Sequence, residues 1–167
     1  TLVKHLTSRQ LITPWGEFTA HAYLDTPSQS FHLALRRGQW DENTNVLVRV
    51  HEPLSLMDVL DTQRSAHAWS LGQALEKINE RQAGIVVLLN CGQGGADLFA
   101  EFTQGDPLQA LSDKAPHTVT DLRTYGIGAQ ILRDCHVRKM TLMASPRRMP
   151  SMTGYGLEVT DYLQRTP

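Results

Sequence analysis

The sequence predicts an α/β fold: a mixed sheet flanked by helices, with antiparallel strands near the N-terminus followed by βαβ-type units. Three observations predict it. Residues 17–24 and 31–37 alternate apolar and polar side chains on either side of a turn-forming sequence at 25–28, as the strands of a hairpin do. Residues 62–81 follow a helical period. Residues 85–89 form an unbroken apolar run, which is typical of a strand covered on both faces.

The remaining elements follow in chain order. Residues 1–10 are polar and have no apolar period, so we interpret them as a linker and assign 11–167 to the folded domain. Within 62–81, Leu71, Leu75 and Ile78 recur at spacings of four and three on one helix face. The other segments are predicted as a strand at 46–50, a short helix at 97–103, a loop at 104–120, a helix at 121–134 and strands at 139–143 and 157–163. Strands that alternate with helices favour right-handed crossovers.

Composition narrows the class of protein. With 167 residues, 41% hydrophobic and 20% charged, the chain has enough apolar residues for the core of one domain. The net charge of -1 gives no field that would attract nucleic acid or an anionic membrane, and no apolar run approaches the roughly 20 residues that span a bilayer. We therefore expect a cytoplasmic protein. Cys91 and Cys135 fit no disulfide framework and are expected to be reduced.

Two segments at the carboxyl ends of predicted strands are candidate walls of a site, because ligands of open α/β sheets bind at that edge. Residues 90–95 are rich in glycine but lack the lysine and hydroxyl residue of a P-loop, so a flexible strand exit is favoured over a phosphate cradle. Residues 144–148 end in Arg147 and Arg148, which could meet a phosphate or could simply be solvated surface.

Several motifs occur in an order that carries more information than any one of them. They are Thr13-Pro-Trp-Gly-Glu-Phe18, Val48-Arg-Val-His51, Asp121-Leu-Arg123, Tyr125-Gly-Ile-Gly-Ala-Gln-Ile-Leu132 and Gly154-Tyr-Gly-Leu-Glu-Val159. From Leu11 onward the chain resembles GTP cyclohydrolase II, an enzyme of riboflavin biosynthesis that opens the guanine ring of GTP. Each glycine of the 125–132 motif lowers helix propensity by about 1 kcal/mol relative to alanine, so Gly126 and Gly128 predict a helix that lies close to the sheet.

The resemblance implies roles for individual residues. Asp121 would be the proton acceptor and Arg123 the nucleophile that attacks the innermost phosphate of GTP. Arg49, His51 and Arg148 would line what remains of the substrate pocket. A structural alternative exists for each of the first two: Asp121 can accept free amide protons at a helix N-terminus, and Arg123 is then a surface residue of the first turn. His51 can likewise be a hydrogen-bonded structural histidine.

The family's zinc ligands are missing from the sequence. The three cysteines that the family places after its Arg-Val-His segment fall, counted from His51, on Leu54, Ser65 and His67. Catalytic zinc is usually held by three protein ligands and keeps one open position, and here only the imidazole is a good ligand. Family contacts to the substrate are replaced in parallel, at Glu52, Pro53, Ser70 and residues 92–94. We expect no bound zinc and no turnover; a magnesium ion is expected only in a parent synthase domain.

The leading hypothesis is a degenerate cyclohydrolase-like domain with a structural or regulatory role. The chain begins with Thr1, and residues 1–10 resemble the junction of proteins that fuse 3,4-dihydroxy-2-butanone 4-phosphate synthase to a cyclohydrolase domain. The resemblance therefore implies an N-terminal synthase domain in the same chain, and a homodimer. One alternative is a module that binds a nucleotide or flavin-pathway metabolite. Another is residual cyclohydrolase activity that converts GTP to a diaminopyrimidine, formate and pyrophosphate.

Overall fold

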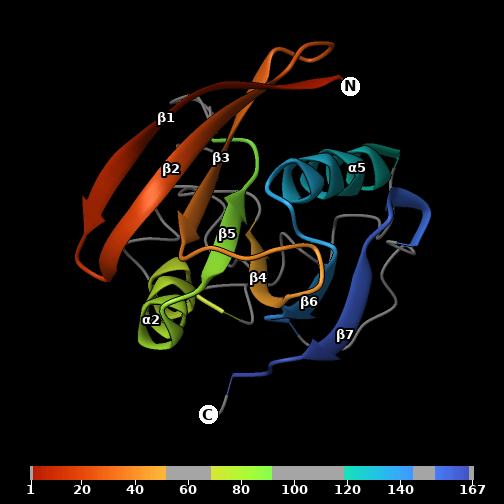
Figure 1. Ribbon diagram of the computed structural model, residues 1–167. Coiled ribbons are helices and arrows are strands. Elements are labelled where there is room, and N and C mark those ends of the chain that lie inside the picture. The colour runs from red at the N-terminus through yellow and green to blue at the C-terminus, as the bar shows by residue number, and fades with distance from the viewer. Residues whose placement is uncertain (1, 52–68, 92–118, 145–152, 166–167) are drawn as a thin grey trace, which may run out of the picture.

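The computed structural model describes residues 2–51, 69–91, 119–144 and 153–165. Seven strands form one sheet in the order β1-β2-β3-β5-β4-β6-β7 (Figure 1). The strands are β1 (Val3–Thr13), β2 (Gly16–Asp25), β3 (Ser30–Arg37), β4 (Asn45–His51), β5 (Gly84–Leu88), β6 (Lys139–Leu142) and β7 (Glu158–Tyr162). The helices are α2 (Leu71–Arg81), α5 (Val119–Asp134) and the short 3-10 helix η1 (Thr153–Tyr155).

The sheet is mixed, as the sequence predicts. Strands β1, β2, β3 and β5 pair antiparallel with one another in that order, whereas β5, β4, β6 and β7 pair in parallel. The antiparallel half is a meander extended by β5, and the parallel half is built from crossovers that carry α2 and α5. The predicted fold class is therefore confirmed, and each predicted strand is found with ends that differ by at most one residue.

The N-terminal segment differs from its prediction. Residues 1–10 were assigned to a linker, but Val3–Thr13 is an 11-residue strand whose register with β2 runs from Val3 opposite Asp25 to Thr13 opposite Gly16. Most of its side chains are exposed, because β1 is the edge of the sheet and pairs on one side only. An edge strand held through its backbone needs no apolar alternation, so a pattern search does not find it.

Helix α2 begins later than predicted because Ser70 caps it. The Ser70 hydroxyl accepts from the Gln73 amide at 3.2 Å, and the Gln73 side chain accepts from the Ser70 amide at 3.1 Å, which is a capping box. Trp69 and Ser70 thus precede the helix, and residues 62–68 lie outside the described part of the chain. At the other end Gln82 adopts a left-handed conformation with φ 60° and terminates the helix.

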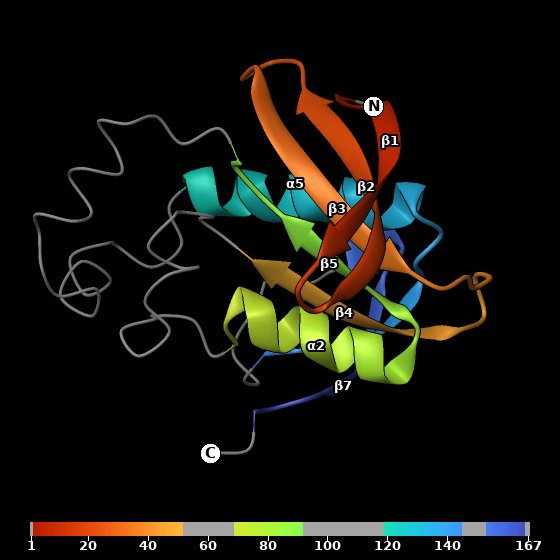
Figure 2. The ribbon, with the colours of Figure 1, turned by 90° about the vertical axis from the view of Figure 1, so that its left-hand side faces the viewer.

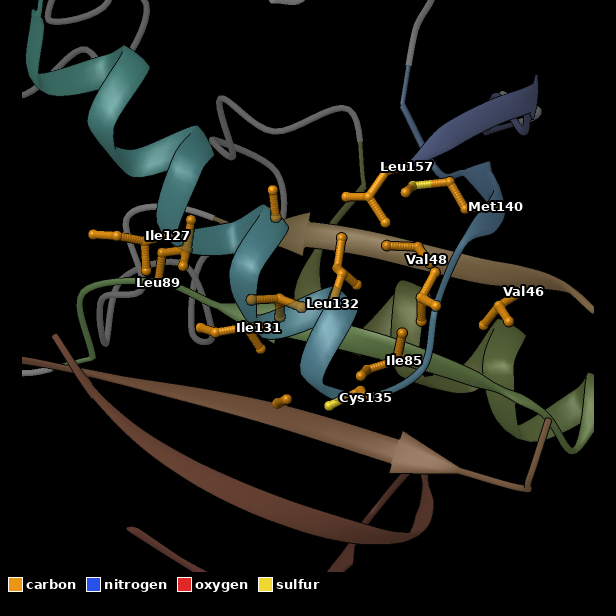
Figure 3. Close-up of a cluster of buried hydrophobic side chains, with 14 of the residues drawn as sticks. Val46, Val48, Ile85, Leu89, Ile127, Ile131, Leu132, Cys135, Met140 and Leu157 are labelled. Carbon is orange, nitrogen blue, oxygen red and sulfur yellow. The ribbon is translucent and has the colours of Figure 1, made fainter. Parts of the chain in front are cut away.

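The two long helices cover opposite faces of the sheet (Figures 1 and 2). Alternate residues of the central strands point to opposite sides: Val48 and Ile85 pack under α5, and Leu47 and Val86 pack over α2. The cluster under α5, drawn in Figure 3, includes Ile127, Ala129, Ile131, Leu132, Cys135, Val137, Met140 and Leu157. Because β5 is buried on both faces, its sequence is continuously apolar, whereas the apolar run of β4 is interrupted by the buried Arg49.

Helix α5 begins at Val119, so the last two residues of the predicted 104–120 loop are helical, while 104–118 and the predicted helix at 97–103 lie outside the described residues. A Cβ at Gly128 would lie 3.7 Å from Leu89 Cδ1, an ordinary contact with a sheet residue. At Gly126 it would lie 3.1 Å from Tyr155 Oη in η1. The predicted close approach to the sheet is therefore wrong for Gly126, where the crowded neighbour is η1.

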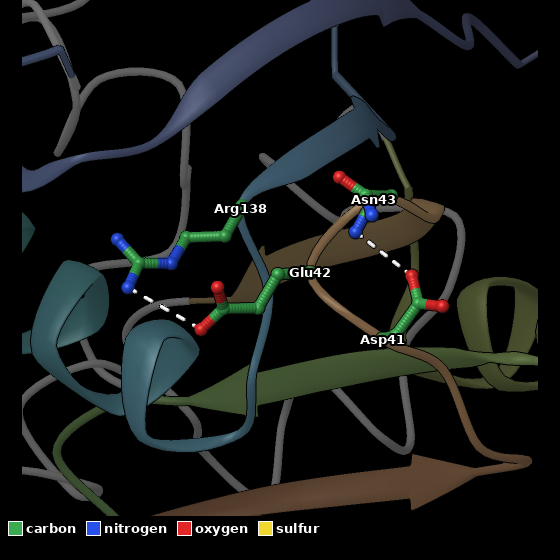
Figure 4. Close-up of polar contacts among 4 residues, drawn as sticks. All are labelled: Asp41, Glu42, Asn43 and Arg138. Atoms are coloured by element: carbon green, nitrogen blue, oxygen red, sulfur yellow. Dashed lines mark hydrogen bonds and ion pairs between the residues drawn. The ribbon is translucent and has the colours of Figure 1, made fainter.

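The connection between β3 and β4 is held by local polar contacts (Figure 4). The Asp41 carboxylate accepts from the Asn43 amide at 2.8 Å, and Arg138 Nη2 lies 3.4 Å from Glu42 Oε1. Both members of this ion pair are partly exposed, so it contributes at most about 1 kcal/mol.

Among the described residues, no helix combines the length and apolar character needed to cross a membrane.

Candidate functional site

The predicted site residues gather at one edge of the sheet, where the parallel strands end. The N-termini of α2 and α5 also lie at this edge (Figure 2). Gly128 of α5 packs against Val50 and Leu89, at the carboxyl ends of β4 and β5. Asp121 precedes Gly128 by seven residues, which is about 10 Å along a helix axis. The first turn of α5 therefore extends past the ends of the strands.

Asp121 lies in the first turn of α5 and Arg123 at the start of the second, and their side chains fall outside what the structure describes. Their position is compatible with both the catalytic role that the resemblance implies and the helix-capping alternative. Arg148 also lies outside the described residues, as do most of the two candidate walls at 90–95 and 144–148. The described part of the site consequently rests on Arg49 and His51 of β4, with Cys91 after β5.

Arg49 is a buried cation that links three segments. Its side chain is 6% exposed on the α2 face of β4. Nη1 donates to the main-chain carbonyl of Met143 at 2.8 Å, and Nη2 donates to that of Trp69 at 3.5 Å. Burial lowers the pKa of Arg49 to about 10, which still leaves the guanidinium charged at neutral pH. Nε has no hydrogen-bond partner among the described residues.

His51 ends β4 and is fully buried. It is two residues from Arg49, so both side chains point to the same face of the strand. Its main-chain carbonyl accepts from the Leu89 amide at 3.1 Å, which continues the pairing of β4 with β5 by one residue. The structure thus brings Arg49 and His51 together at the strand end, in an enclosed rather than solvent-filled position.

Cys91 is unsuited to nucleophilic chemistry. Its thiol donates to the Leu88 carbonyl at 3.2 Å, and burial raises the pKa of Cys91 to about 11. A thiol with so high a pKa carries almost no thiolate at neutral pH. Cys135, the other free cysteine, is buried near Tyr23, and burial also raises its pKa. Both thiols are therefore core groups.

Two residues at this edge have structural roles that the sequence did not reveal. Ser70, where the sequence resemblance implies a family glutamine that contacts the purine, caps α2. Trp69 is buried, accepts Arg49 at its carbonyl and donates from Nε1 to the Leu163 carbonyl at 3.0 Å. Contacts made through main-chain carbonyls leave no signal in a sequence, because every residue has a carbonyl.

The described residues contain no group of three or more histidine, cysteine, aspartate or glutamate side chains placed to hold a metal. The positions that correspond to the family's cysteines, Leu54, Ser65 and His67, lie in the part of the chain that is not described. A cavity of about 230 Å³ lies elsewhere, near the amino ends of β4 and β6, where Asn45, Val46 and Thr141 line it. It is therefore separate from the candidate site.

Comparisons with known proteins agree with this arrangement. The model of the GTP cyclohydrolase II family matches residues 4–164. A 3,4-dihydroxy-2-butanone 4-phosphate synthase of Neisseria meningitidis serogroup A is 38% identical over 97% of this chain and 42% of its own length. The riboflavin biosynthesis protein RibBA of Aquifex aeolicus is 39% identical over 96% of this chain and 41% of its own length.

The crystal structure of RibBX, a two-domain 3,4-dihydroxy-2-butanone 4-phosphate synthase from A. baumannii, is similar in fold. It superposes with a TM-score of 0.61 at 28% identity, over 99% of this chain and 40% of that one. The chain thus spans about two fifths of the length of the relatives that it matches. The family match over nearly the whole chain and the shared fold lead to one conclusion: the chain belongs to the GTP cyclohydrolase II family.

Proposed function

We propose that this chain is a catalytically inactive GTP cyclohydrolase II-like domain. In this proposal it is the C-terminal structural or regulatory part of a 3,4-dihydroxy-2-butanone 4-phosphate synthase in riboflavin biosynthesis. The observation that carries the proposal is the replacement of the three zinc-binding cysteines by Leu54, Ser65 and His67. Leucine has no donor atom and a neutral serine hydroxyl is a poor ligand for zinc, so one imidazole remains where three ligands are needed.

The loss of zinc would remove the chemistry as well as the metal. In a catalytic zinc site the ion lowers the pKa of a bound water to about 7, which makes hydroxide available at neutral pH. The described thiol nearest to this edge, Cys91, has a pKa of about 11 and offers no alternative nucleophile. Asp121 and Arg123 remain in the sequence, but without an activated water the guanine ring would not be hydrolysed.

The contacts of Arg49 support a structural role for a residue of the family motif. Two of its donors are used on the carbonyls of Met143 and Trp69, which joins the end of β6 to the start of α2. A hydrogen bond from a charged donor contributes about 1.5–3 kcal/mol, so this residue stabilises the packing of the parallel strands. An arginine at position 49 can thus be retained for its contribution to folding after catalysis is lost.

The relatives support the fusion part of the proposal. Both the Neisseria relative and the A. baumannii structure are described as synthases, and each is more than twice as long as the matched region. We place the protein in the cytoplasm, where the free thiols of Cys91 and Cys135 would stay reduced. We also expect the full-length protein to be a homodimer, which light scattering on the purified protein would test.

The fusion role is tested by deleting residues 3–167, which include all of β1, from the full-length gene product. The proposal expects the remaining synthase to change in turnover of ribulose 5-phosphate, in thermal stability or in oligomeric state. The control is a full-length variant with Leu54→Ala, which changes a vestigial zinc position and is expected to leave the synthase unaffected. A deletion that leaves all three properties unchanged would refute the role.

The loss of catalysis needs its own experiment. Full-length protein is purified with zinc present, its metal content is measured, and release of formate and pyrophosphate from GTP is followed. The proposal expects substoichiometric zinc and no release above a protein-free control. Stoichiometric zinc together with turnover that disappears in Asp121→Asn would establish residual cyclohydrolase activity instead.

One observation favours a second candidate, a module that binds a nucleotide or flavin-pathway metabolite. Arg49 is a buried cation whose Nε has no partner among the described residues, and it lies at the edge where family ligands bind. Titration calorimetry of the full-length protein with GTP and flavins at millimolar concentration tests this candidate. Heat that is lost in Arg123→Ala would support binding at the remnant pocket, and absence of heat with every ligand would eliminate it.

A further inference from the structure

Strands β1, β2 and β3 form what we call the N-terminal ribbon. The end of this ribbon at the β2–β3 turn has one covered face and one open face. On the α5 face, Val3, Tyr23, Asp25 and His32 are all at most 8% exposed. These residues are neighbours across β1, β2 and β3, because Val3 pairs with Asp25, and Tyr23 pairs with His32. Polar as well as apolar side chains are thus buried on this face.

The opposite face of the same ribbon end is apolar but is not covered in the same way. Leu24 pairs with both Lys4 and Phe31, so the three side chains form one row across the strands. Phe31 is 51% exposed, and Leu24 is half-buried. Further along the same face, Ala20 and Leu35 are buried in the cluster that packs on α2. Among the described residues, the cover of this face therefore ends before the row of Phe31.

Two more exposed leucines extend this surface. Leu2 is 58% exposed, and its carbonyl accepts from the Thr26 amide at 3.0 Å, which places it one row beyond Lys4 and Leu24. Leu6 is 49% exposed and lies in the bulge of β1, where two residues oppose Ala22. We call this surface the ribbon patch; it consists of Leu2, Leu6, Leu24 and Phe31, bordered by Ala22 and Leu33.

From this arrangement we infer that the ribbon patch is the surface on which the synthase domain of the full-length protein docks. The inference rests on the proposed function, because it presumes the fusion. Contiguous exposed apolar surface marks interaction sites, and here it adjoins Leu2, at the end of the ribbon where a preceding domain would be attached. The relatives have more than half of their length outside the matched region, which is ample for such a domain.

The chemistry of the patch specifies its partner. An apolar surface with a central lysine, Lys4, fits a partner surface of aliphatic or aromatic side chains with a carboxylate opposite the ammonium group. A second copy of β1 fits poorly, because Val3–Thr13 contains Lys4 and Arg9 but no acidic residue. Side-by-side pairing of two such edges would place like charges on adjoining strands.

Photo-crosslinking in the full-length protein tests the location of the partner. The crosslinking residue p-benzoylphenylalanine replaces Phe31, which is exposed enough to accept it, and in a matched control it replaces Ile12. Ile12 is 86% exposed at the far end of β1. The inference expects crosslinks from position 31 to peptides of the synthase domain and none from position 12. Crosslinks confined to residues 1–167, of the same or a second chain, or no crosslinks, would overturn it.

A substitution in the full-length protein measures the contribution of the patch. Phe31→Glu buries a charge in the proposed interface and is expected to lower the docked-to-free ratio on the order of tenfold or more. Hydrogen exchange of the amides of residues 2–6 should rise accordingly, whereas Ile12→Glu should leave it unchanged. Equal exchange in both variants would contradict the inference. If deletion of residues 3–167 alters the synthase while Phe31→Glu has no effect, the docking surface is wrong and the proposed function still stands.

Discussion

Tyr23 and Asp134 tie the N-terminal ribbon to the end of helix α5: the Tyr23 hydroxyl donates to Asp134 Oδ2 at 2.6 Å. The two residues are 111 positions apart in the sequence. Burial, followed by the hydrogen bond to Asp134, raises the pKa of Tyr23, so the phenol stays protonated and remains a donor at any physiological pH. This contact joins β2, in the antiparallel half of the sheet, to the end of the helix that covers one face of the sheet.

The first prediction follows from this bond. Tyr23→Phe keeps the buried ring and removes only the hydroxyl, so we expect the free energy of unfolding to fall by about 1–2 kcal/mol, the contribution of a hydrogen bond to a partly exposed carboxylate. Chemical denaturation measures it. Tyr162→Phe is the matched control, because no hydrogen bond of its hydroxyl is recorded among the described residues, and a loss of the same size there would show that the bond is not responsible.

The second prediction concerns pH. His21 and His32 are held in the neutral form, and in each case burial lowers the pKa below its usual value near 6.5. For His32 the geometry agrees, because Nδ1 accepts from the Asn90 amide at 2.9 Å and cannot do so when protonated. As pH falls below about 6.5 the unfolded chain binds protons that the folded chain does not, so stability decreases.

The expected loss per histidine is at most about 1.4 kcal/mol for each pH unit below 6.5, and it ends at the lowered pKa of the folded state. Denaturation midpoints measured between pH 7.5 and 5 would show it. His21→Gln should reduce the slope, because the substituted side chain does not titrate. A midpoint independent of pH across this window would contradict the assignment of neutral histidines.

The third prediction compares two glycines of α5. Gly128→Ala adds helix propensity and a methyl group at ordinary contact distance, so we expect up to about 1 kcal/mol of stabilisation. Gly126→Ala has the same propensity gain, but its methyl group would lie 3.1 Å from Tyr155 Oη and part of the gain is lost. The difference in unfolding free energy between the variants is the measurement; Gly126→Ala more stable than Gly128→Ala would be contrary to expectation.

The fourth prediction tests Ser70 as a structural residue. Ser70→Ala removes the side-chain acceptor of the capping box and should lower the unfolding free energy by about 1 kcal/mol. Ser70→Asp keeps an acceptor and should retain most of the stability. If Ser70 instead contacted a ligand, both variants would weaken nucleotide binding in calorimetry and neither would change the denaturation midpoint.

The parts of the fold that were found from the sequence share one property: each has a local period or end signal. The continuous apolar run of β5 reflects burial on both faces, and the spacing of Leu71, Leu75 and Ile78 reflects one buried helix face. Strand β1 was missed because its exposed side chains have no such period. The helical period predicts too early a start for α2, because a period alone does not show that Ser70 is the N-cap.

The candidate site, too, is predicted only in part by the sequence. Its residues were chosen by family motif, and Arg49 and His51 do meet at the end of β4. What these side chains bind could not be foreseen, since the partners of Arg49 are carbonyls of Met143 and Trp69, 94 and 20 residues away. Asp121 and Arg123 are placed in the first two turns of α5, and their proposed loss of function still rests on the sequence alone.

By itself the sequence predicted the family and the mixed α/β architecture, because these depend on residue types and on local spacing; the proposed loss of the zinc site also rests on the sequence alone. Only the tertiary structure decided that the N-terminal segment is a sheet edge, that Arg49 is bonded to two distant carbonyls, and that Leu2, Leu6, Leu24 and Phe31 share an open face. The physical reason is that strand pairing, carbonyl contacts and surface exposure arise between segments far apart in the chain, where no periodicity records them.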